Sequence, residues 1–423
     1  MNRRTRSADA HDRSATTHRS PVRPALVLVG VLLLAANLRT ALAGYPPLLE
    51  IARDQLGVSA AGAGLVQASA VMMMGVGSFL APGLAGPLGW ERALGVSVGV
   101  LAAGSAVRLA PVLPALIVGS VLVGFGIGAA GVLLAGVVKH HLADRAGTVT
   151  GGYVVSMMIG ATVTSVVAVP LAAGLGGWSY SLAVWAVPAA LAVGIWWPVA
   201  RRFPRAEDRG SAALPWRTPF AWLATGFMGM TSVQFYGWLT WLSPYYQHLG
   251  WSTQSAALLQ ALWSVAQIPA ALLFPALAER RRRWAFWSAL SVLSGLAGTA
   301  GALWLPLPPV VGPWGWVVLM AIGVGAGFPL GLSVIAWHFP DAASAGAASG
   351  LAMGFGYLLA GSAPLVMGLL LDVTGGYPVP LAVLLVAGVA QGGAIALIQL
   401  RNGVAPRPEP AGQSSSGQTG PSF

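Results

Sequence analysis

The 423-residue chain contains no cysteine and few charged residues. Without cysteine it cannot be a secreted scaffold held together by disulfides. Charged residues make up 8% of the sequence, whereas soluble domains carry about 25%. Acidic residues are especially scarce, with 12 Asp and Glu against 23 Lys and Arg. The composition therefore excludes a soluble globular protein and leaves the basic excess to be explained by where the arginines lie.

Apolar residues dominate instead, at 56% of the chain, with a mean hydropathy of +0.72. A run of about 20 apolar residues crosses a bilayer core of about 30 Å as a helix, and helices satisfy their backbone polar groups without help from lipid. We expect an all-α membrane protein with twelve transmembrane helices in two pseudo-symmetric six-helix halves. The expected spans are 25–46, 60–82, 91–110, 112–138, 147–173, 177–199, 218–247, 252–277, 285–306, 312–337, 345–371 and 377–400.

The positions of the basic residues predict the orientation. By alternation of the spans, all 23 Lys and Arg except Arg39, Arg53 and Arg108 fall in the tails or in loops on the same side as the tails. The positive-inside rule then predicts a multi-pass membrane protein with both termini in the cytoplasm. No nucleic-acid partner is needed to explain the net charge of +11. An alternative is a cleavable signal peptide ending at "ALAG", residues 41–44, which would leave eleven spans.

The chain also repeats itself around a polar segment at 200–217. Asn37 and Arg39 match Gln234 and Tyr236 in the second half, in the same order. Two parallel six-helix halves are the repeat pattern of major facilitator transporters, whose substrate site lies between the halves. The expected organisation is a disordered cytoplasmic tail at 1–24, a first half at 25–199, a cytoplasmic linker at 200–217, a second half at 218–400 and a disordered cytoplasmic tail at 401–423.

A glycine-rich stretch, "GFGIGAAG" at 124–131, lies inside an apolar span. A dinucleotide-binding loop needs a preceding strand and an exposed helix start, and neither is expected here. Small residues in a membrane helix allow neighbouring helices to approach closely. We therefore interpret this stretch as a packing surface.

Arg39 is the one basic residue that lies well inside an expected span, away from both of its ends. A charged side chain near the bilayer centre costs about 2.5 kcal/mol or more, and no acidic residue lies centrally in any span. The guanidinium fork can donate two hydrogen bonds to one planar group. These features favour contact with a transported anion, or with a solute that carries nitro or carbonyl oxygens. The alternative is a structural arginine whose partners are backbone carbonyls and water.

Other residues join the candidate site by position or through the repeat. The expected substrate-binding set is Arg39, Asn37, Gln234, Tyr236, Tyr153, Tyr357 and Trp241. The candidates for gating or coupling are Glu50, His338, Lys139, Asp144 and Asp341. The pairs Lys139 with Asp144 and His338 with Asp341 could form contacts that break between conformations, or could be solvated loop ends. No metal site and no cofactor is expected.

Four sequence stretches resemble the cyanate permease and 2-nitroimidazole transporter family of the major facilitator superfamily. They are "ANLRTAL", "KHHLADRAGTVTGGY", "QFYGWLTWLSPYYQ" and "GFPLGLSVIAWHFPDAASAGAASGLAMGFGYLLAGSAPLVMGLLLDVTGGY". The resemblance implies a twelve-helix inner-membrane permease for small solutes. Three positions depart from the family pattern: Thr40 stands in place of proline, His338 in place of arginine and Met353 in place of glutamine. The loss of the glutamine removes a polar group, so the exact substrate does not carry over.

The functional hypothesis is a secondary transporter rather than an enzyme. It moves a small anionic, nitro-bearing or carbonyl-bearing solute by alternating access, with Arg39 in the central cavity. The alternative is a broad-specificity drug efflux permease of the same fold in which Arg39 is structural. The expected partners are the solute and the lipid bilayer, the chain is expected to be a monomer, and a proton or counter-anion is left open as the coupled ion.

Overall fold

The computed structural model describes residues 24–203, 215–309, 312–339 and 342–402, and these form helices without any strand. Apart from one 3-10 turn at Ala143–Arg145, the helices are α1 (Pro24–Ala43), α2 (Tyr45–Leu56), α3 (Ala60–Leu88), α4 (Trp90–Val107), α5 (Leu113–His141), α6 (Ala146–Leu175), α7 (Trp178–Ala183), α8 (Ala186–Ala200), α9 (Pro219–His248), α10 (Thr253–Arg281), α11 (Trp284–Trp304), α12 (Trp314–His338), α13 (Ala342–Thr374) and α14 (Pro378–Asn402).

These helices make twelve membrane crossings, as the sequence predicts. Ten segments are long and apolar enough to span a bilayer by composition alone, with α1 and α2 counted as one segment and α7 and α8 as another. The remaining two crossings are α4, of 18 residues, and α9, of 30 residues. Helix α4 begins with Trp-Glu-Arg and α9 contains glutamine, threonine, serine and tyrosine, so their hydropathy is lower although their length suffices.

The first crossing differs from the expected span 25–46, because it is longer and broken. Helix α1 ends at Ala43, Gly44 forms a turn, and α2 starts at Tyr45 and continues to Leu56. Pro46 and Pro47 lie in the first turn of α2. Proline is tolerated there because the first backbone N–H groups of a helix have no partner within it. The prolines therefore mark the start of a second helix and not the end of the span.

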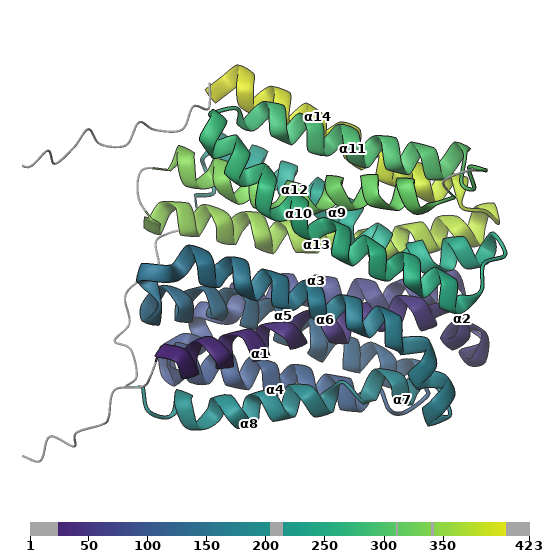
Figure 1. Cartoon of the computed structure of the whole chain (residues 1–423), viewed down its shortest axis with the longest axis horizontal. Helices are drawn as coiled ribbons and strands as arrows, with labels where there is room; N and C mark the ends of the chain where they lie inside the picture. Colours follow the sequence, from purple (N-terminus) through teal and green to yellow (C-terminus); the bar gives the residue numbers. More distant parts are fainter. Residues whose placement is uncertain (1–23, 204–214, 310–311, 340–341, 403–423) are drawn as a thin grey trace, which may run out of the picture.

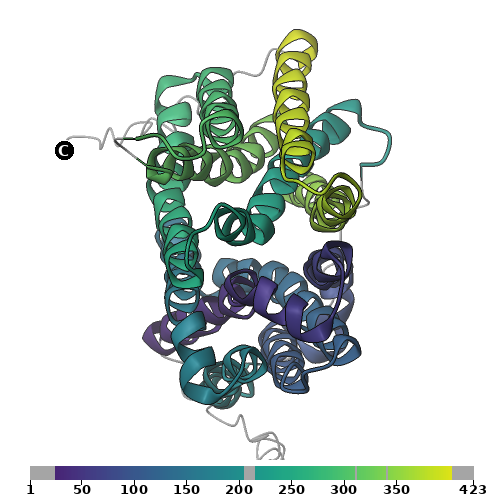
Figure 2. The ribbon, with the colours of Figure 1, turned by 90° about the vertical axis from the view of Figure 1, so that its right-hand side faces the viewer.

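The crossings form two groups that lie side by side. Helices α1 to α8 occupy the lower part of Figure 1 and α9 to α14 the upper part, and the end-on view in Figure 2 shows the same two groups. Helix α1 begins and α14 ends at the same end of the bundle, at the left of Figure 1. We call this the terminal end, and the opposite end, where α2 lies, the far end. The expected tails and most of the expected linker lie outside the described residues.

Long helix pairs join the two groups. The most extensive contact between them is formed by α3 and α13, and the next by α6 and α10. Helix α2 adds contacts to α9 and α10 at the far end. The two groups therefore meet along two helix pairs, with α1, α6, α9 and α10 available to enclose a space between them.

The glycine-rich stretch at 124–131 lies in α5 and packs against α3. A side chain at Gly124 would collide with the backbone of Ala70, and one at Gly128 would collide with the backbone of Met74. Only glycine leaves room for this approach. The packing interpretation is confirmed.

Two charged residues that alternation places in loops are buried instead. Arg108, at the end of α4, is 2% exposed and donates to the carbonyl oxygen of Ala41 at 2.6 Å and to the Ser120 hydroxyl at 3.0 Å. Glu91, at the start of α4, lies 2.6 Å from the ring nitrogen of His141 at the end of α5. Alternation assigns residues to a side of the membrane, but it carries no information about whether a side chain at a helix end turns inward.

Candidate functional site

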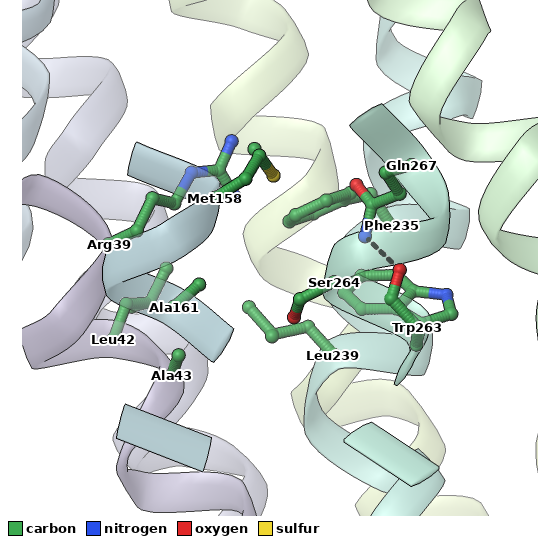
Figure 3. Close-up of a pocket in the computed structure, with 10 residues that line it drawn as sticks. All are labelled: Arg39, Leu42, Ala43, Met158, Ala161, Phe235, Leu239, Trp263, Ser264 and Gln267. Atoms are coloured by element: carbon green, nitrogen blue, oxygen red, sulfur yellow. Dashed lines mark hydrogen bonds between the residues drawn. The ribbon is translucent and has the colours of Figure 1, made fainter. Parts of the chain in front are cut away.

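A small pocket lies where the two groups of helices meet (Figure 3). Helices α1 and α6 supply one side, and α9 and α10 supply the other. Most of the lining is apolar, and the polar groups are a guanidinium, a hydroxyl, an amide and an indole. The residues that line the pocket are Arg39, Leu42, Ala43, Met158, Ala161, Phe235, Leu239, Trp263, Ser264 and Gln267.

Arg39 is the charged residue of this pocket. Its guanidinium carbon lies 4.6 Å from the centroid of the Phe235 ring, so a cation–π contact joins α1 to α9. No other residue in the described part of the chain makes a hydrogen bond or an ion pair with Arg39, and no acidic residue lines the pocket. The aromatic face stabilises the charge but accepts no conventional hydrogen bond, so the five N–H donors of the guanidinium remain available to a ligand.

Two of the expected tyrosines lie next to this arginine. The rings of Tyr236 in α9 and Tyr357 in α13 are 6.1 Å apart, and the Tyr236 ring lies 4.9 Å from that of Phe235, over which the Arg39 guanidinium lies. The Tyr236 hydroxyl lies 3.6 Å from the sulfur of Met74, which belongs to the other group of helices. Tyr153 in α6 packs, like Tyr357, against the buried cluster that contains Tyr236. The structure thus brings Arg39, Tyr236, Tyr357 and Tyr153 into one region, although the three tyrosines do not line the pocket itself.

Gln234 has its amide directed into the second group of helices. Its Nε2 donates to Gln391 Oε1 at 2.7 Å and to the Met230 carbonyl at 3.3 Å. Gln391 in turn donates to the Thr231 hydroxyl at 2.6 Å. This hydrogen-bonded network links α9 to α14. The structure therefore does not place Gln234 among the side chains that line the pocket.

Asn37 and Trp241 also make internal contacts. The Asn37 amide donates to the Leu33 carbonyl of its own helix at 2.8 Å. The indole of Trp241 donates to the Pro364 carbonyl of α13 at 3.1 Å, and the side chain is 1% exposed. Neither residue lines the pocket, and their hydrogen bonds support helix α1 and the contact between α9 and α13.

The expected gating residues are spread over both ends of the molecule. At the far end, Glu50 forms an ion pair with Arg53 at 2.8 Å, one turn along α2, and so already has a cationic partner other than Arg39. At the terminal end, Lys139 and Asp144 are exposed, and the structure pairs neither with an opposite charge in the part of the chain it describes. The His338 ring stacks on Phe220 with centroids 3.5 Å apart, and Asp341 lies outside the described residues.

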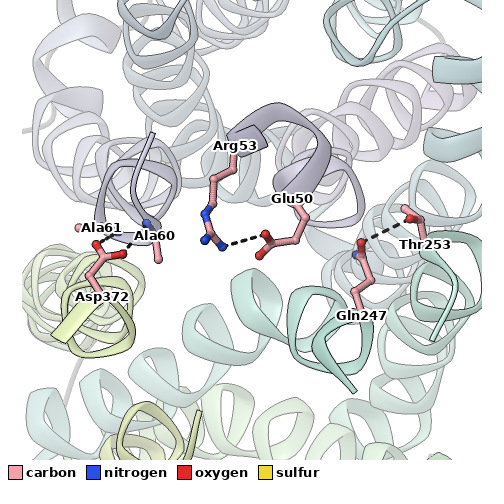
Figure 4. Close-up of polar contacts among 7 residues, drawn as sticks. All are labelled: Glu50, Arg53, Ala60, Ala61, Gln247, Thr253 and Asp372. Carbon is pink, nitrogen blue, oxygen red and sulfur yellow. Dashed lines mark hydrogen bonds and ion pairs between the residues drawn. The ribbon is translucent and has the colours of Figure 1, made fainter. Parts of the chain in front are cut away.

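A contact between the two groups at the far end was not anticipated (Figure 4). Asp372, near the end of α13, accepts hydrogen bonds from the backbone N–H groups of Ala60 at 2.9 Å and Ala61 at 2.8 Å. These groups open helix α3, where the helix dipole favours negative charge. The Asp372 carboxylate therefore links α13 to the first turn of α3.

Sequence reasoning also missed Phe235, Trp263, Ser264 and Gln267. A signal for the last two exists in "QALWSVAQ", residues 260–267. Gln260, Ser264 and Gln267 are spaced at i, i+4 and i+7, which places them on one face of an otherwise apolar helix. A polar stripe on one face of a membrane helix points to the protein interior and not to lipid.

Residues 27–364 match the Major Facilitator Superfamily. The chain is 31% identical to the 2-nitroimidazole transporter of Escherichia coli, over 84% of this chain and 91% of that protein. It is 30% identical to the cyanate transport protein CynX of Escherichia coli, over 83% of this chain and 91% of that protein.

Solved structures support the same fold. A bacterial homologue of the human lysosomal transporter Spinster, in an inward-facing and unoccupied conformation, superposes with a TM-score of 0.69 at 15% identity, over 91% of this chain and 96% of that chain. The same family is indicated by the twelve crossings in two groups, by the superfamily match and by the two relatives. The chain belongs to the Major Facilitator Superfamily, as a transporter of the cyanate permease and 2-nitroimidazole transporter family.

Proposed function

We propose that this protein is a secondary transporter for small solutes that carry a negative charge or nitro or carbonyl oxygens, and that Arg39 binds those oxygens. The observation that carries the proposal is the guanidinium at the pocket, which has an aromatic neighbour but no carboxylate or hydrogen-bond acceptor within the described residues. A planar fork of donors matches two oxygens of one group. The relatives named for 2-nitroimidazole and cyanate transport fit this chemistry.

Alternating access is part of the same proposal. The pocket is lined by α1 and α6 of the first half and by α9 and α10 of the second, so a rocking motion of the halves changes the side from which it is reached. The Asp372 contact to α3 holds the far end together in this conformation and has to break before that end can open. We propose that the far end faces outward and that both termini lie in the cytoplasm of a bacterial inner-membrane protein, in line with the positive-inside rule.

Residues of a single chain complete the lining of the pocket, so the proposed site needs no second copy, and we propose a monomeric transporter that carries out no enzymatic step. Drug efflux by the same fold remains the second candidate. One observation favours it: the Phe235 ring already provides Arg39 with a partial structural partner. In that case the aromatic lining of Phe235 and Trp263 would bind varied apolar cations.

Uptake into proteoliposomes separates the two candidates. Purified protein is tested with labelled cyanate and a labelled nitroimidazole, each in competition with small anions and with unrelated lipophilic cations. The proposed function predicts saturable uptake that small anions and nitro compounds inhibit and lipophilic cations do not. Inhibition by many unrelated cations, without inhibition by anions, would support efflux instead.

A further inference from the structure

Gln267 is a buried polar residue on the side of the pocket opposite Arg39. It belongs to α10, is 3% exposed and lines the pocket, whereas Arg39 belongs to α1 (Figure 3). The two side chains thus come from different halves of the transporter. A solute in the pocket contacts both halves when it contacts both residues.

The orientation of the Gln267 amide follows from its neighbour. Its Nε2 donates to the backbone carbonyl of Trp263 at 3.0 Å. A carbonyl oxygen only accepts hydrogen bonds, so the amide must present its NH₂ group to Trp263 and its oxygen to the opposite side. In Figure 3 that oxygen lies on the pocket side of the amide. No residue in the described ranges donates a hydrogen bond to it.

The backbone around Gln267 is held closely. A side chain at Gly325 of α12 would lie 2.9 Å from the Cα of Gln267, so the two helices are in contact at this position. Trp263, one turn away on α10, is 1% exposed and its ring lies 4.9 Å from that of Phe235. This packing fixes the helix from which the amide projects, which is the condition for a preorganised binding group.

The two sides of the pocket therefore differ in the hydrogen bonds that they can make. Arg39 can only donate hydrogen bonds, while the free oxygen of Gln267 can only accept them. The aromatic rings of Phe235 and Trp263 line the same pocket, with centroids 4.9 Å apart. A solute that satisfies both ends has oxygen acceptors at one end and an N–H or O–H donor at the other.

We propose that Gln267 is a specificity-determining residue, whose carbonyl oxygen accepts a hydrogen bond from an N–H or O–H group of the solute that Arg39 binds through its oxygens. The inference rests on the proposed function. Among anionic and nitro-bearing solutes, the Gln267 oxygen favours the compact ones that also carry a hydrogen-bond donor. A neutral hydrogen bond of about 0.5–1.5 kcal/mol corresponds to a preference of roughly 2- to 12-fold for the donor-bearing solute.

Three solutes and two variants test this inference. The solutes are a nitroimidazole with a free ring N–H, the same compound methylated on that nitrogen, and cyanate, which has no donor. Gln267→Met keeps the length of the side chain but removes the acceptor. Gln399→Met, on α14 and outside the pocket, is the matched control for the same exchange. Elution profile and melting temperature of each purified variant report whether it is folded.

We expect the wild type and Gln399→Met to prefer the N–H compound over its N-methyl derivative in kcat/KM by roughly 2- to 12-fold. In Gln267→Met this ratio falls to about one, while cyanate uptake changes by less than about twofold, because cyanate makes no such hydrogen bond. A steric effect of the methyl group alone would leave the ratio unchanged in Gln267→Met, and that result overturns the inference.

Failure of the inference differs from failure of the proposed function. Wild-type uptake of cyanate without either nitroimidazole, or equal losses for all three solutes in Gln267→Met, overturns the role of Gln267 and leaves the transporter assignment intact. If lipophilic cations are taken up and none of the three solutes is, the proposed function fails and the inference fails with it.

Discussion

The guanidinium of Arg39 lies over the ring of Phe235, with 4.6 Å between its carbon and the ring centroid. This contact connects the first half of the protein to the second across the pocket. Because the ring stabilises the cation without using its hydrogen bonds, the arginine is held in place and still available to a solute. The site can thus keep a charge in the membrane interior without a carboxylate partner.

Replacing Phe235 by leucine should weaken solute binding. The cation–π contact contributes about 0.5–2 kcal/mol, and without it the guanidinium is free to leave the position over the pocket. We expect KM for an anionic solute to rise by about 2- to 30-fold in Phe235→Leu. Phe235→Trp, which keeps an aromatic face, should stay closer to the wild type in affinity. Equal KM values in Phe235→Leu and the wild type would show that the ring does not position the arginine.

The link between Asp372 and the first turn of α3 should control opening of the far end. Asp372→Asn removes the charge that interacts with the helix N-terminus and one of the two acceptors. For an exposed group this contribution is about 1 kcal/mol, which corresponds to roughly a fivefold shift toward the open conformation.

The absence of cysteine makes this shift measurable. Ala43→Cys places a unique thiol in the pocket, and its labelling by an impermeant maleimide added outside the cell reports opening of the far end. Labelling should be several-fold faster when Asp372→Asn is added. Asp54→Asn, an exposed carboxylate on α2 at the same end, is the control. Equal rates in all three backgrounds would argue against a latch at Asp372.

The close packing of α5 against α3 should not tolerate a side chain at Gly124. A methyl group there would overlap the backbone of Ala70, and such overpacking costs about 1–3 kcal/mol. We expect Gly124→Ala to lower the melting temperature and the yield of monodisperse protein in detergent. Gly131→Ala, in the same helix but facing open space, should behave like the wild type. A normal melting curve for Gly124→Ala would contradict the packing described here.

The fold could be predicted from the sequence because ten crossings are apolar runs of sufficient length by composition alone and α4 and α9 are long enough to span. Within lipid, a helix of that length satisfies its own backbone polar groups. The break at Gly44 could not be predicted from apolarity. In the sequence, Pro46 and Pro47 are compatible both with the end of one helix and with the start of another. The packing of α2 against α9 and α10 decides between these outcomes.

The site was predictable only in part, because the partners of a polar side chain depend on the tertiary structure. Arg39 stands out because no acid lies near it in the sequence, and its cost in the membrane points to a special environment. Gln234 gave a similar signal, yet its amide pairs with Gln391, on a helix far along the chain. Arg108 gave no signal, since its partners are a backbone carbonyl and a serine. A sequence shows which groups need partners, whereas the tertiary structure shows which of them find one inside the protein.

The central claim is that Arg39 binds the transported solute, and its most direct test is uptake of an anionic solute by proteoliposomes that contain Arg39 variants. Hydrogen bonds to a charged group contribute about 1.5–3 kcal/mol, so Arg39→Ala should lower kcat/KM by at least about tenfold. Arg39→Lys should recover part of the loss, because it keeps the charge but not the fork. Undiminished uptake by a well-folded Arg39→Ala variant would contradict the account.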